Sequence, residues 1–121
     1  MPARRRVDPA AGEEALAAWA AAEEAEVPRA VLATAVRYTV EELAARAPGR
    51  AVEVRVPPYA AAQVIEGPRH TRGTPTNVVE TDPQTWLALV TGRTSWAEAV
   101  ASGSVRASGR RADLTAYLPL R

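Results

Sequence analysis

The sequence has 121 residues, a formal net charge of +1, one histidine and no cysteine. A chain of this length buries roughly 65% of its extended surface when it folds, which is enough for one hydrophobic core. The missing cysteine excludes disulfides, thiol catalysis and thiolate metal centres, and the single histidine excludes a site with two histidine ligands. The near-zero net charge gives no reason to expect binding to nucleic acid or to an acidic membrane.

The N-terminal part is predicted to be peripheral. Residues 1–11 resemble a disordered tail, and no apolar run of a signal peptide or a transmembrane helix follows their basic start. We therefore expect a cytoplasmic protein without stable membrane insertion. The Ala- and Glu-rich segment that follows predicts a helix whose only large apolar side chains are Leu16 and Trp19, so we expect it to dock weakly. This divides the chain into a tail with a helical arm, residues 1–26, and a domain, residues 27–121.

The domain opens with an amphipathic helix predicted over residues 28–47, which the Pro-Gly pair after it ends. Valines alternate with charged residues over 51–57, which predicts a strand with one buried and one wet face. A Pro-Pro turn leads into a second, alanine-rich strand over 60–66. Small side chains on the inner face of a sheet leave volume that large partners fill or that stays open as a cavity.

A polar loop, residues 67–76, connects this hairpin to a third strand predicted over 76–81. The loop contains two Gly, two Pro, two Arg and the only His, which makes it a candidate recognition element. Arg69, His70 and Arg72 are candidate contacts for the carboxylate or phosphate head group of a ligand, although Arg69 and Arg72 would equally suit ordinary solvated charges.

Two short helices are predicted next, over residues 83–91 and 96–102. Asp82 is a suitable N-cap for the first, because its carboxylate can accept hydrogen bonds from N–H groups of the first turn. Ser95 and Glu98 have the spacing of a capping box at the start of the second.

The chain is predicted to end with a strand and a helix. Gly103 stops the second short helix, and alternation over 104–107 indicates a strand. A last helix is predicted over 110–118, because Leu114 and Leu118 would share one of its faces.

The order of caps, glycines and apolar residues in this half resembles the sterol carrier protein domain, in a small stand-alone bacterial form. The resemblance covers about residues 27–120, and the segment 77–83 is similar to the actinobacterial type. It implies an α+β fold with a mainly antiparallel sheet of about four to five strands that helices cover on one face. The residues that carry the resemblance are Asp82, Trp86, Leu89, Gly92, Trp96, Ala99, Gly103, Val105, Gly109, Leu114 and Leu118.

The resemblance also implies binding of a lipid, fatty acyl chain or sterol-like molecule in an apolar tunnel between the sheet and its helices. It carries no catalytic signature, so we expect a non-enzymatic protein with no cofactor and no metal. The apolar residues predicted to line the tunnel are Trp86, Leu89, Val90, Trp96, Val100, Leu114 and Leu118. The same residues would also suit an ordinary packed core.

Two other functions are compatible with the sequence. The chain could be an accessory or interaction module that docks on a separate enzyme, or a homodimer joined through its Ala-rich arm, without a lipid ligand. An enzymatic interpretation would centre on His70 with Arg69, Arg72 and Glu80. It lacks a nucleophile motif, paired carboxylates and a phosphate-binding glycine loop, so we set it below the other two.

Overall fold

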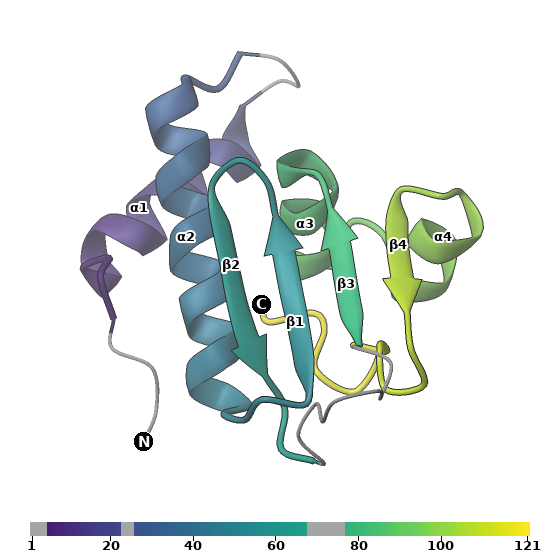
Figure 1. Cartoon of the computed structure of the whole chain (residues 1–121). Coiled ribbons are helices and arrows are strands. Elements are labelled where there is room, and N and C mark those ends of the chain that lie inside the picture. Colours follow the sequence, from purple (N-terminus) through teal and green to yellow (C-terminus); the bar gives the residue numbers. More distant parts are fainter. Residues whose placement is uncertain (1–4, 23–25, 68–76) are drawn as a thin grey trace.

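In residues 5–22, 26–67 and 77–121, which the computed structural model describes, four helices and four strands form an α+β fold (Figure 1). The predicted strands and the three helices at 28–47, 83–91 and 96–102 are confirmed to within a few residues at their ends. In chain order, the elements are α1 (Pro9–Ala21), α2 (Arg29–Arg46), β1 (Val52–Val56), β2 (Ala60–Val64), β3 (Val78–Thr81), α3 (Pro83–Val90), α4 (Trp96–Ala101) and β4 (Val105–Ser108).

The four strands form one mixed sheet in the order β2-β1-β3-β4. The predicted hairpin is confirmed: β1 and β2 are antiparallel, with Val54 opposite Ala62. β3 lies parallel to β1 on its other side, and β4 pairs antiparallel with β3. Two of the three pairings are thus antiparallel, and β2 and β4 are the edge strands.

The helices cover one face of the sheet: α3 lies behind β1 and β3 in Figure 1, and α2 runs along the outer side of β2. The valines of β1 are fully buried toward these helices, whereas Glu53 and Arg55 lie on the other face and form a 2.7 Å ion pair. This is the alternation that the sequence predicted for a sheet with one wet face. None of the helices in the described residues is long and apolar enough to cross a bilayer.

Local capping chemistry sets the ends of the two short helices. Asp82 accepts a 2.8 Å hydrogen bond from the backbone N–H of Thr85, and Pro83 occupies the first turn of α3. Ser95 and Glu98 form both halves of a capping box at α4. Gly92, with a φ of 78°, supplies the left-handed residue after α3.

The prediction of a helix over residues 110–118 is wrong. This segment contains two short turns, and Asp113 accepts hydrogen bonds from the backbone N–H and the hydroxyl of Thr115. An aspartate that binds nearby N–H groups in this way competes with helix formation. Leu114 is nevertheless fully buried, so the segment closes the core without regular structure.

The N-terminal helix begins at Pro9, inside the segment expected to be disordered, because Asp8 caps it. Its side chains Leu16 and Trp19 are each 5% exposed and belong to the main hydrophobic core, which differs from the weak docking that we expected. The helix can approach α2 closely because Gly12 presents no side chain to the ring of Tyr38. The division into an arm and a domain stays a prediction.

Candidate ligand-binding groove

The residues predicted to line a tunnel fall into three environments. Trp86, Leu89, Val90 and Leu114 are at most 2% exposed and lie together in the main core. Trp96 and Leu118 are half-buried against that core, whereas the side chain of Val100 is 41% exposed. The structure therefore brings six of the seven together and places Val100 on the surface of α4.

Arg69, His70 and Arg72, the predicted head-group contacts, lie outside the described residues.

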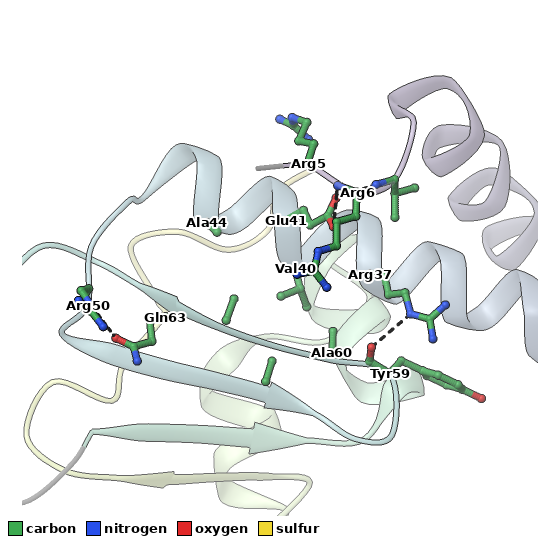
Figure 2. A pocket seen from close by; sticks show the side chains of 13 residues that line it. Arg5, Arg6, Arg37, Val40, Glu41, Ala44, Arg50, Tyr59, Ala60 and Gln63 are labelled. Atoms are coloured by element: carbon green, nitrogen blue, oxygen red, sulfur yellow. Dashed lines mark hydrogen bonds between the residues drawn. The ribbon is translucent and has the colours of Figure 1, made fainter. Parts of the chain in front are cut away.

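A large open groove lies between α2 and the edge strand β2, with a volume of about 1310 Å³ (Figure 2). Small-molecule pockets commonly have about 300–1,000 Å³, so the space is ample for a ligand. None of the seven predicted tunnel residues lines it. The lining residues are Arg5, Arg6, Val7, Arg37, Val40, Glu41, Ala44, Arg50, Tyr59, Ala60, Ala61, Ala62 and Gln63.

The floor of the groove is apolar, and it is open because β2 carries small alanines where β1 carries larger valines. Ala60 and Ala62 lie on the face that points toward the helices, opposite Val56 and Val54, and both are only partly buried. Ala44 on α2 is also small. The sequence predicted that these alanines would leave volume, and the structure leaves it as an open groove.

Arginines stand at both ends of this floor. Arg37 donates from Nε to the carbonyl oxygen of Tyr59 at 3.3 Å, and Arg50 donates from Nε to the side-chain oxygen of Gln63 at 3.3 Å. Both bonds use Nε, so among the described residues no side chain or carbonyl occupies the terminal nitrogens of the two guanidinium groups, and these could bind an anion.

The groove concentrates positive charge. Its lining carries four arginines and one glutamate, a net charge of +3, against +1 for the whole chain. A groove with an apolar floor and basic ends is chemically suited to an amphiphile with an anionic head group.

The N-terminal strap, which we define as Arg5–Asp8, forms the wall of the groove over α2. The carboxylate of Glu41 accepts hydrogen bonds from the backbone N–H groups of Arg6 and Val7, each at 3.1 Å. Arg5 forms a 2.6 Å ion pair with the neighbouring Glu42. Burial disfavours the ionised form of Glu42, but Arg5 and Arg46 more than offset this, so the pKa of its carboxyl lies below the ordinary value.

Sequence reasoning missed the basic side chains of the groove. The strap lies within the segment that was expected to be a disordered tail. The alanine run of β2 was the signal that did point to open volume. In the described part of the chain, no cluster of three acidic or histidine side chains could hold a metal ion.

A family model described as "Bacterial SCP ortholog", where SCP denotes sterol carrier protein, matches residues 28–120. The match includes α2, the whole sheet, α3 and α4, and it leaves out α1 and the N-terminal strap. No curated protein matches the chain. Because the family model spans most of the sequence and the fold is the α+β arrangement that the resemblance implied, the chain belongs to the bacterial sterol carrier protein family.

Proposed function

We propose that this protein binds a hydrophobic small molecule with a single alkyl chain in the groove between α2 and β2. Membership of the sterol carrier protein family supports lipid binding in general. The observation that carries the choice of site is the large groove with an alanine floor and arginines at its ends.

The dimensions of the groove fit a single chain. Tyr59, directly before β2, and Gln63, within it, contact the arginines at the two ends, and an extended chain of this length spans about 13 Å. Each buried methylene contributes about 0.8 kcal/mol, so an alkyl chain along this floor can supply most of the binding free energy. An arginine of the groove lining then meets the head group.

The predicted tunnel between sheet and helices is the second candidate location. A ligand there would have to displace side chains that already pack in the core, including Trp86, whose indole N–H donates a 2.8 Å hydrogen bond to Thr39. We therefore place the groove first and keep the tunnel as an outcome of the test.

The family generally consists of non-catalytic carrier domains, and we propose no reaction for this chain. An accessory role without a lipid ligand, by docking on an enzyme or by self-association, is the alternative that a negative binding result would favour.

The test is titration of the full chain with dodecanoate, followed by amide chemical shifts and calorimetry. We expect saturable binding near micromolar, about −8 kcal/mol, with shift changes at Tyr59–Gln63 and along α2. Ala62→Leu should weaken binding at least tenfold, because the added side chain occupies the groove floor. It should change stability by less than about 1 kcal/mol, because the space that it fills is open.

Ala107→Leu is the matched control. Ala107 is an exposed alanine on the opposite edge strand, beside a separate hollow of about 530 Å³, so the same substitution there should leave binding unchanged. Shift changes and altered Trp emission centred on Trp86 and Trp96 would move the site to the tunnel. No binding by calorimetry would contradict the proposal.

A further inference from the structure

Two adjacent arginines of the N-terminal strap point in different directions. The guanidinium of Arg5 is held by Glu42, whereas Arg6 points from the strap into the groove, toward Val40 (Figure 2). The Arg6 side chain forms no hydrogen bond or ion pair with the residues that the structure describes, although its backbone N–H is bound. Its position is therefore set by the backbone of the strap.

Glu41 holds that backbone. One of its oxygens, Oε1, accepts both the Arg6 and the Val7 N–H groups at 3.1 Å, and Oε2 accepts the Arg6 N–H as well. Hydrogen bonds to a carboxylate are stronger than those to a neutral acceptor. They link residues that are 34 and 35 positions apart in the sequence. Glu41 is also the only carboxylate among the lining residues that the structure describes, and its oxygens are occupied by these hydrogen bonds to the strap.

We propose that Arg6 is the head-group contact for an anionic amphiphile in this groove and that Glu41 is the residue that positions it. The inference rests on the proposed function and adds a specificity determinant to the same site. Arg6 lies outside residues 28–120, which match the family, while Glu41 lies inside them. The N-terminal segment of this chain therefore supplies an element of the site that the matched region lacks.

Removing the Glu41 carboxylate should have opposite effects on anion binding, depending on whether this residue acts through its charge or by positioning Arg6. If Glu41 acted only through its charge, its removal would strengthen the binding of an anion, because a nearby negative charge would disappear. If it positions Arg6, its removal releases the strap and weakens anion binding. Glu41→Leu separates the two, since it removes both the charge and the acceptor. Glu41→Gln keeps an oxygen where Oε1 accepts both N–H groups, so it should preserve the strap.

The experiment compares dodecanoate with dodecanol, which has the same chain length and no charge, by calorimetry on the full chain. We expect the wild type to prefer dodecanoate. Arg6→Gln should reduce this preference about tenfold through weaker dodecanoate binding alone, the size expected for one charge-assisted hydrogen bond. Glu41→Leu should reduce the preference to the same extent, and Glu41→Gln should retain it.

Arg106→Gln is the matched control, because it removes an equal charge outside the groove, on the opposite edge strand, from a side chain that is paired with Glu80. It should change the preference less than twofold. Amide hydrogen exchange supplies a readout that needs no ligand: the Arg6 and Val7 amides should be protected in the wild type and in Glu41→Gln, and lose protection in Glu41→Leu.

Three results would overturn the inference while leaving the groove as a binding site. The first is an equal loss of affinity for dodecanoate and dodecanol in Arg6→Gln. The second is a stronger preference for dodecanoate in Glu41→Leu. The third is a lack of exchange protection at the Arg6 and Val7 amides in the wild type. Failure of both ligands to bind the wild type would overturn the proposed function together with this inference.

Discussion

At the scale of single residues, the contact between Thr39 and Trp86 shows how the core accommodates polar atoms. The Thr39 hydroxyl donates to the carbonyl oxygen of Ala35 at 2.8 Å and accepts the indole N–H of Trp86 at 2.8 Å. Both residues are at most 1% exposed. Because a buried N–H without an acceptor is costly, this pair fixes the orientation of the largest side chain in the core.

We expect Thr39→Val to destabilise the protein by about 1–3 kcal/mol, because the shape is kept while the indole N–H loses its acceptor. Urea unfolding measures the effect. Thr34→Val is the control, since the Thr34 hydroxyl makes the same bond to the carbonyl four residues earlier, at 3.0 Å, on an exposed site. Equal losses in the two variants would mean that the Trp86 contact contributes nothing.

At the scale of elements, the packing of α1 on α2 depends on a missing side chain. A Cβ atom at Gly12 would lie 2.1 Å from Cγ of Tyr38, which is far closer than atoms approach in folded proteins. The Tyr38 hydroxyl in turn donates to the carboxylate of Glu13 on α1. Glycine in a helix is usually a weakness, but here it allows two helices to come into contact.

Gly12→Ala tests this packing by the sign of its effect. On helix propensity alone the substitution would stabilise α1 by about 0.8–1.0 kcal/mol. The structure predicts a net loss of about 1–3 kcal/mol instead, because the methyl group forces α1 away from Tyr38. Ala17→Gly, at an exposed position of the same helix, reports the propensity effect by itself in the same unfolding experiment. A stabilising Gly12→Ala would show that α1 does not pack on α2 in solution.

At the scale of the whole molecule, a charged cluster joins Arg121 to α1 and α2. Arg121 forms ion pairs with Glu13 of α1 and, at 3.7 Å, with Glu42 of α2. Its neighbour Leu120 accepts a 3.0 Å hydrogen bond from Arg46 through its carbonyl oxygen. Hydrogen bonds from Tyr38 and Arg121 lower the pKa of Glu13 below its ordinary value of 4.5. Burial and the bond to Glu13 raise the pKa of Tyr38.

This cluster should make stability depend on pH in the acid range. A carboxyl group whose pKa is lower in the folded state stabilises that state above the unfolded pKa, and the contribution is lost as pH falls through the folded value. We therefore expect a loss of stability below about pH 4.5, measured by urea unfolding between pH 7 and pH 3. Glu13→Gln should lower the free energy of unfolding at pH 7 and reduce the amount of stability that is lost on acidification. The effect should be modest, because solvent screens the interaction of this half-exposed carboxylate without abolishing it.

Asp113→Asn separates this cluster from other acidic groups. Hydrogen bonds from Thr115 also lower the pKa of Asp113, but this residue takes no part in the ion pairs of the cluster. If Glu13→Gln left the loss of stability in acid unchanged while Asp113→Asn reduced it, the Arg121 cluster would not be the source of that loss.

The sequence alone determined where most elements begin and end, because caps and alternation act between residues a few positions apart. Asp82, the capping box at Ser95 and the valines of β1 are of this kind. The same local chemistry explains the one incorrect helix, where Asp113 binds the residues just after it. The family resemblance followed from the spacing of these local signals.

Only the tertiary structure decided the location of the groove and of its charged residues. That site depends on β2 being an edge strand, on α2 lying beside it, and on Glu41 capturing a strap from more than thirty residues away. None of these contacts leaves a periodic pattern, because they join segments that are distant in sequence and each depends on the others being in place. For the same reason Leu16 and Trp19 looked peripheral in the sequence, while in the folded chain a glycine in their helix lets them enter the core.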